Sequence, residues 1–300
     1  MIPGDVIWSY SVAGAIFAIW LAVLLRSGDW QRARGFDRLI LFGPIFYAAP
    51  LAAFGTEHFT QARGIASAVP KWIPWHLFWA YFVGACFILA PLSIVTRIQA
   101  RLSASLLALT FFLFVVLMDL PAWSRNPGDQ FGLTLALREL SFSGGALALV
   151  ATLTQRSNAR RATILATIAR YFVAVPALVY SFEQFTHTDH VPGVPLRPLT
   201  PAYVYGHVMW TYLAAAAYAV ASILLLIGRK TRAAATLLGG TVLWLMLVVY
   251  VPIGIVERAS LNRGLNFVFD TLMYGGAVLL LAGAMPREKV VREVVRGEPT

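Results

Sequence analysis

The chain has 300 residues, of which 59% are hydrophobic and only 13% are charged, with a mean hydropathy of +0.70. These values exclude an ordinary soluble domain and indicate a protein that crosses a membrane many times. The net charge of +10 does not indicate nucleic-acid binding, because the basic residues fall in short connections between apolar runs, where they orient the spans. The single cysteine, Cys86, excludes an internal disulfide and CxxC redox chemistry.

Long apolar runs without period-two alternation predict membrane-spanning helices rather than a β-barrel. The predicted fold class is therefore an all-α integral membrane protein with about nine transmembrane helices. The predicted spans cover residues 7–25, 39–54, 77–96, 102–120, 134–154, 168–185, 203–227, 233–256 and 266–284.

The charges of the connections predict the orientation. Connections 26–38, 97–101, 155–170 and 228–232, with the tail after residue 285, hold 17 of the 24 Lys and Arg residues, so we expect this side to be cytoplasmic. The leading segment MIPGDV has no positive charge and is not typical of a signal peptide, so the first span is expected to be retained with its N-terminus outside. A bacterial inner membrane is the predicted location.

Two regions of the chain, residues 39–154 and 168–284, match each other as four-span halves. Glu57 and Phe59 match Glu183 and Phe185 at an offset of 126 residues. Further pairs match at an offset of 131: Trp79 with Trp210, Pro121 with Pro252, and Gly144-Gly145 with Gly275-Gly276. We predict two tandem four-helix bundles in the same orientation, with an N-terminal span and loop over 1–38 and a charged cytoplasmic tail, a short helix or a frayed end, over 285–300.

Ionisable side chains in or beside a span are costly in lipid and are therefore candidates for function. We expect all of them at the outer ends of spans, namely Glu57, Asp119, Arg138, Glu139, Glu183, Glu257 and Asp270. The alternative is a structural role, in which Asp119 and Arg138 link adjacent helices. Glu57 and His58 can form a catalytic acid/base pair, and the alternative for His58 is a hydrogen bond to a loop carbonyl that tethers the following linker.

Several short motifs in the first half resemble the DoxX family. They are His58-Phe59, the linker VPKWIP over 69–74, the aromatic stretch 81–84, Arg138-Glu139-Leu140, and Gly144-Gly145-Ala146-Leu147. The resemblance covers 39–154 well and 168–284 weakly, where Gln184 replaces the histidine and Phe269-Asp270 replaces Arg138-Glu139. It implies a four-helix membrane unit and an association with redox processes, including a quinone-reducing thiosulfate oxidase subunit and partners of oxidative-stress enzymes.

The leading functional hypothesis is a redox-associated subunit that binds a quinone or another lipophilic small molecule in an outward-facing cleft. A quinone needs a proton donor and an apolar slot, and we expect Glu57, His58, Trp72, Trp75, Tyr81, Arg138, Glu139 and Asp119 to supply them. The expected partners are membrane lipids and a periplasmic or membrane redox protein. The alternatives are a non-enzymatic transporter and a scaffold for a periplasmic enzyme, so the sequence leaves open whether the protein is an enzyme.

Metal and haem cofactors are not expected. His187, Asp189 and His190 offer ligand atoms but lack a zinc or copper spacing, so a solvated loop is favoured. His76 and His207 begin matching spans, and a haem held between them is a lesser alternative.

Overall fold

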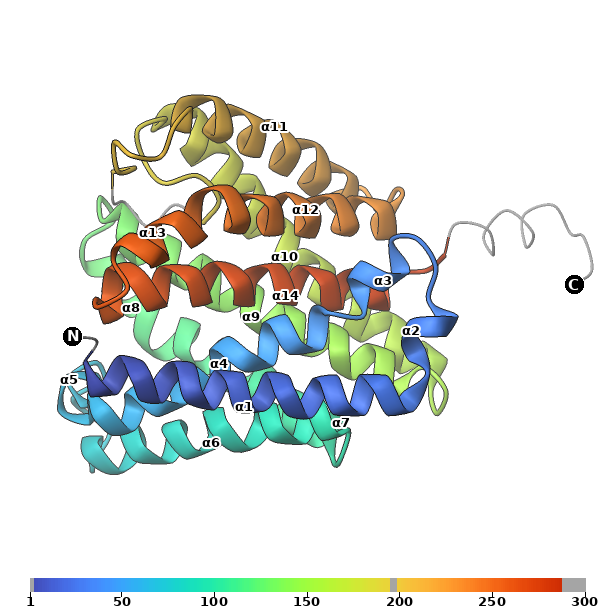
Figure 1. The fold of residues 1–300 in the computed structure, drawn as a ribbon, viewed down its shortest axis with the longest axis horizontal. Helices are drawn as coiled ribbons and strands as arrows, with labels where there is room; N and C mark the ends of the chain where they lie inside the picture. The colour runs from blue at the N-terminus through green and yellow to red at the C-terminus, as the bar shows by residue number, and fades with distance from the viewer. Residues whose placement is uncertain (1–2, 195–198, 288–300) are drawn as a thin grey trace, which may run out of the picture.

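The computed structural model describes residues 3–194 and 199–287, and the part of the chain it describes is a bundle of long helices that lie side by side (Figure 1). Nine helical stretches in these residues are long and apolar enough to cross a membrane, which makes the protein an all-α multi-pass membrane protein. Most of the predicted tail, residues 288–300, lies outside the described residues. In chain order the elements are α1 (Gly4–Ser27), α2 (Asp29–Arg32), α3 (Asp37–Ile40), α4 (Gly43–Thr60), α5 (Ala62–Ala66), α6 (His76–Thr96), α7 (Ala100–Phe114), η1 (Val115–Asp119), α8 (Leu120–Arg125), α9 (Gln130–Thr154), α10 (Ala159–Thr186), α11 (His207–Leu226), α12 (Thr231–Leu245), η2 (Met246–Tyr250), α13 (Val251–Val256), η3 (Leu261–Asn266) and α14 (Phe267–Ala284).

Most of the observed helices extend past the predicted spans, most of all at the start of α10, whereas α11 begins at His207, four residues after its predicted start. The sequence predicts this span from residue 168, but the helix begins at Ala159 because Asn158 caps it, its side chain accepting a hydrogen bond from the backbone N–H of Arg161. The basic residues Arg160 and Arg161 therefore lie on the first turn of a helix and not in a connecting loop.

The two matching halves exchange their last helices. Within each half the helices pack in chain order, α4 on α6 and α7 on α9, and likewise α10 on α11 and α12 on α14. The last helix of each half then packs on the first helix of the other half, α9 on α10 and α14 on α4, while α9 and α14 also pack on each other. The centre of the molecule is therefore formed by α9 and α14, and α1 lies outside against α4 and α6 (Figure 1).

Glycines allow the close helix approaches that this exchange requires. A Cβ atom on Gly145 of α9 would lie 2.5 Å from the Cβ of Ala277 on α14, and a Cβ on Gly276 of α14 would lie 2.4 Å from the backbone nitrogen of Tyr47 on α4. Both distances are shorter than real contacts, so only glycine fits. Small residues at helix contacts are the usual way for membrane helices to pack tightly.

The backbone itself repeats at an offset of 131. The segments α7, η1 and α8 begin and end at positions that, moved by 131, are those of α12, η2 and α13. Left-handed backbone at Trp75, Arg97 and Gln99 recurs at Gly206, Gly228 and Lys230. One side-chain bond recurs as well, because the indole N–H groups of Trp79 and Trp210 donate to the carbonyl oxygens of Pro74 and Tyr205.

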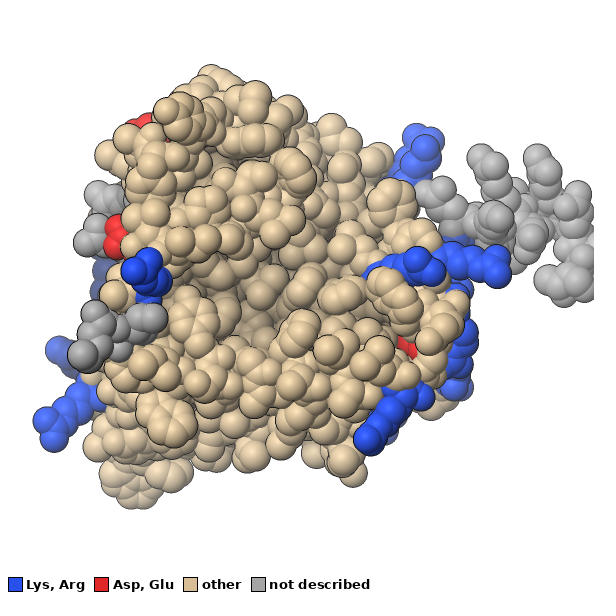
Figure 2. All heavy atoms as spheres, in the orientation of Figure 1, with Lys and Arg blue, Asp and Glu red and all other residues tan. Residues whose placement is uncertain are grey.

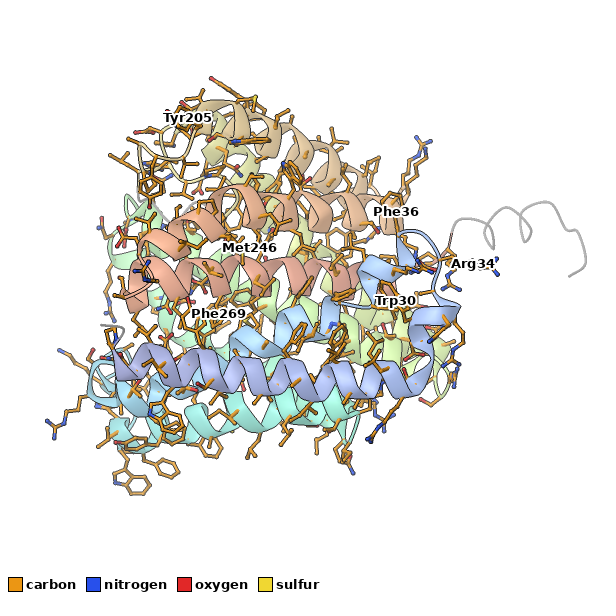
Figure 3. All side chains as sticks on the ribbon, in the orientation of Figure 1. Trp30, Arg34, Phe36, Tyr205, Met246 and Phe269 are labelled. Atoms are coloured by element: carbon orange, nitrogen blue, oxygen red, sulfur yellow. The ribbon has the colours of Figure 1, made fainter. Side chains whose placement is uncertain are left out.

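The two ends of the bundle differ in charge. Lys and Arg gather at the end where α2 and α3 lie, which we call the basic end, while the wide middle of the visible face is uncharged (Figure 2). Trp30, Arg34 and Phe36 lie around these two short helices (Figure 3). We call the opposite end, where α4 ends and α6 begins, the acidic end.

Candidate functional site

Five carboxyl side chains from five helices lie inside the bundle towards its acidic end. Glu57, Asp119, Glu183 and Asp270 are buried, and the Oε2 atom of Glu139 is buried as well. They come from α4, η1, α10, α14 and α9 respectively. We call them, together with Arg138, the carboxyl cluster. Such groups are rare inside a membrane and mark functional sites by default.

Arg138 of α9 forms an ion pair with Asp270 of α14, at the contact between the two central helices. Both side chains are nearly enclosed, with 14% and 9% of their surfaces exposed. The guanidinium also lies over the ring of Phe142, 5.7 Å from its centroid. The ion pair of Arg138 is therefore made to the other half of the chain, and its interaction with Asp119, suggested by the sequence, is electrostatic without a direct ion pair among the described residues.

Asp119 lies beside Glu139, and the two carboxyl groups interact with each other. Asp119 Oδ2 and Glu139 Oε2 are both buried and have no hydrogen-bond partner among the described residues. Two carboxyl groups this close repel each other when both are ionised. Asp119 is the last residue of η1, a π-helical segment within its span. Such segments often occur at functional sites.

Glu57 and Glu183 flank this centre. Glu57 Oε2 accepts a hydrogen bond from Asn266 Nδ2 at 3.4 Å, and its Oε1 is buried without a partner. Glu183 Oε2 accepts a hydrogen bond from Thr134 Oγ1, also at 3.4 Å. The hydroxyl of the fully buried Tyr180 donates to the carbonyl oxygen of Thr134 at 2.9 Å and so joins α10 to α9 beside the cluster.

The cluster extends from the acidic end into the bundle. Glu139 is the tenth residue of α9, about 14 Å from its start at 1.5 Å per residue. The expectation that all ionisable groups lie at span ends is therefore wrong for Glu139. Since Glu57 lies only three residues from the end of α4, the carboxyl groups extend from near the acidic surface to about a third of the depth of α9.

The other predicted site residues are not brought together. His58 is adjacent to Glu57 but faces α6, where its ring packs on Phe87, and its Nδ1 is 2.8 Å from the carbonyl oxygen of Phe54 in its own helix. The predicted tethering contact belongs to His76, whose Nε2 is 3.2 Å from the carbonyl oxygen of Pro70 in the linker.

The aromatic residues predicted for the cleft lie on the surface. Trp72 and Trp75 expose 70% and 77% of their surfaces, whereas Glu57 exposes 9%. Tyr81 is also exposed and packs on Phe59. These three aromatic residues thus face the surroundings of the bundle, and only Glu57, Arg138, Glu139 and Asp119 of the predicted set belong to the carboxyl cluster.

Some members of the cluster were missing from the predicted site. The sequence identifies Asp270 and Glu183 as ionisable residues in spans but assigns neither to a site, and it gives no sign of Asn266 and Thr134, which hydrogen-bond to the cluster. The repeat carried a signal for Asp270, because it matches Glu139 at an offset of 131.

In the part of the chain that the structure describes, no group of three or more His, Cys, Asp or Glu residues has an arrangement that could hold a metal ion. The rings of His187 and His190 stack with centroids 5.1 Å apart.

No protein family, curated protein or solved structure matches the chain.

Proposed function

We propose that this membrane protein exchanges protons at its carboxyl cluster while it handles a lipophilic small molecule of the quinone class. The observation that carries the proposal is that Asp119 and Glu139 lie beside each other with buried, unpartnered carboxyl oxygens, next to the buried ion pair of Arg138 and Asp270. In this proposal Asp119 and Glu139 share one proton. A quinone takes up protons when it is reduced and releases them when it is oxidised, so it needs such groups nearby. The resemblance of residues 39–154 to the DoxX family supports the redox association.

In this proposal each part of the cluster has its own task. Asp119 and Glu139 hold the exchangeable proton. Arg138 balances the charge of Asp270, so that Asp119 and Glu139 can gain or lose a proton without a second unbalanced charge beside them. Glu57 connects the pair to the acidic surface, since it lies one turn from the end of α4. Electrons come from a membrane or periplasmic redox partner, because the single cysteine cannot cycle between dithiol and disulfide.

The proposed location is a bacterial inner membrane with the basic end in the cytoplasm. The connections at that end carry most of the Lys and Arg residues, as the positive-inside rule requires. The N-terminus and the carboxyl cluster then lie towards the outside, and the cluster exchanges protons with that side.

A proton-coupled transporter is the second candidate. The observation that favours it is the exchange of α9 and α14 between the halves, with the Arg138–Asp270 ion pair at their contact. Movement of one half against the other would change this contact, and parallel repeats of this kind are common in transporters.

The test uses the full chain in lipid nanodiscs with ubiquinone-1 as the probe. Binding is followed by tryptophan fluorescence, and proton release or uptake by a pH dye in weak buffer. We expect ubiquinone-1 to bind and to change the number of bound protons in the wild type and in Asp189→Asn, a control that alters an exposed carboxylate. Glu139→Gln should bind with a smaller proton change. Absence of binding, or an equal proton change in Glu139→Gln, contradicts the proposal, and uptake of the probe into proteoliposomes favours the transporter.

A further inference from the structure

A cavity of about 530 Å³ lies at the basic end, where α1, α4, α6, α7, α9 and α14 come together. Its walls are mostly apolar and include Trp20, Ile94, Val95, Leu149, Leu279 and Leu280. The volume is within the range of about 300–1,000 Å³ that is usual for small-molecule sites. This cavity is at the opposite end from the carboxyl cluster and has no place in the proposed function.

The rim of the cavity is basic. Arg97, Gln99 and Arg101 line it, at the turn between α6 and the first residues of α7. Arg97 is 2.5 Å from Asp29 Oδ2, so its charge is balanced within the protein. Arg101 is exposed, and among the described residues it has neither an ion pair nor a side-chain hydrogen bond. One positive charge at the mouth of an apolar cavity is therefore left unbalanced.

The matching position in the second half shows that the fold does not require an arginine here to be unpaired. Arg232 corresponds to Arg101 at an offset of 131, and each is the second residue of its helix. Arg232 is nevertheless fully used by the protein, because it pairs with Asp37 at 2.6 Å and donates to the carbonyl oxygens of Ala282 and Met285. At matching positions, Arg232 thus binds groups of the protein itself, whereas the side chain of Arg101 is free to bind a ligand.

We propose that the cavity binds one anionic phospholipid of the surrounding bilayer. The apolar walls take part of an acyl chain, and the phosphate lies at the rim against Arg101, with Arg97 close by. The position fits this ligand, because Arg101 lies at the end of a span, where lipid headgroups are found. The charge selects an anionic headgroup over a zwitterionic one, since a choline group would meet the unbalanced charge of Arg101.

The test measures lipid retention by the full chain purified in detergent. Phosphatidylglycerol, phosphatidylcholine and oleate are added separately, and bound lipid is counted by native mass spectrometry. We expect one phosphatidylglycerol per chain and weaker binding of phosphatidylcholine. Arg101→Gln should weaken phosphatidylglycerol binding roughly fivefold, the effect of one arginine near an anionic headgroup. The matched control Arg160→Gln, an exposed arginine of α10, should leave it unchanged.

A second variant tests the cavity apart from its charge. Gly283 lines the cavity, and Gly283→Leu should reduce retention of phosphatidylglycerol while the thermal unfolding midpoint shows that the protein still folds. Equal binding of phosphatidylglycerol and phosphatidylcholine, equal effects of Arg101→Gln and Arg160→Gln, or a preference for oleate would each overturn the proposal.

Discussion

The two halves share the same backbone over α7 to α8 and α12 to α13 but use their polar residues differently. The π-helical segments η1 and η2 occupy matching positions at an offset of 131. The last residue is Asp119 in the first half and Tyr250 in the second. Asp119 contacts Glu139 inside the bundle, whereas the hydroxyl of Tyr250 donates to the carbonyl oxygen of Pro192 and holds the long connection before α11. The π segment therefore belongs to the fold of both halves, and the contacts at its end depend on the residue in its last position.

The ends of α4 and α10 show the same contrast. Gln184 replaces the histidine of the first half, and its side-chain amide bonds both the N–H and the carbonyl oxygen of Gly193 in the long connection. His58 makes no comparable contact to its own linker, since it faces Phe87 and a carbonyl group of its own helix. The second half thus uses Gln184 and Tyr250 to hold a loop. The matching residues of the first half, His58 and Asp119, hold no loop.

The largest expected effect comes from breaking the ion pair that joins the halves. Arg138→Ala leaves Asp270 buried without its cation, which should destabilise the protein by about 3–5 kcal/mol. Unfolding by denaturant in detergent micelles measures the change. The double variant Arg138→Met with Asp270→Leu removes both charges and should recover most of the loss. A double variant as unstable as Arg138→Ala would show that the pair is not the cause.

A smaller loss is expected where α14 packs on α4. Gly276→Ala places a Cβ atom 2.4 Å from the backbone nitrogen of Tyr47, and overpacking of this kind costs about 1–3 kcal/mol. Gly240→Ala is the matched control, because a Cβ at that helical position has no atom within 4 Å. Thermal unfolding of the two variants should differ clearly. Equal midpoints would contradict the tight contact between α14 and α4.

The hydrogen bonds from Gln184 to Gly193, which we call the loop clamp of the second half, should contribute a comparable amount. Gln184→Leu leaves the backbone groups of Gly193 unpaired in a buried position, at a cost of about 1–3 kcal/mol. The converse variant, His58→Gln, should be nearly neutral because no loop depends on His58. Amide hydrogen exchange of the segment around Gly193 measures the loop clamp directly. Unchanged protection in Gln184→Leu would show that Gln184 does not hold this segment.

The smallest effect concerns the surface ion pair that anchors α2. The hydrogen bond from Arg97 holds the pKa of Asp29 below its ordinary value of about 3.9. The pair therefore adds stability above that pH and loses it as pH falls through the lowered pKa. Because Asp29 is partly exposed, Asp29→Asn should cost less than about 1 kcal/mol at neutral pH. The difference in unfolding free energy between wild type and variant should be smaller at pH 3 than at pH 7, and a constant difference would argue against the pair.

The sequence predicted the spans well because their apolar runs are as long as a membrane is thick. It placed the start of α10 nine residues late, since the polar first turns of that helix extend beyond the apolar run. It could not reveal η1 and η2, because a π segment changes the direction of side chains without changing composition. It therefore missed the contact of Asp119 with Glu139. The division of the chain into two bundles stays a prediction.

The ion-pair partner of Arg138 could not be predicted from the sequence for a related reason. Asp119 was the natural choice, since it lies on the preceding span of the same half. The true partner, Asp270, is 132 residues away and reaches Arg138 only because the halves exchange their last helices. A repeat in the sequence shows which helices match but not which of them pack together.

We propose that Asp119 and Glu139 share a proton inside the bundle, and infrared difference spectroscopy tests this proposal most directly. Spectra of the protein in nanodiscs, recorded across a pH change in H₂O and in D₂O, report the C=O stretch of protonated carboxylic acids. We expect a carboxylic acid band that shifts in D₂O, persists in Asp189→Asn and is lost or displaced in Glu139→Gln and in Asp119→Asn. A spectrum without such a band, or a band that both cluster variants leave unchanged, would contradict the account.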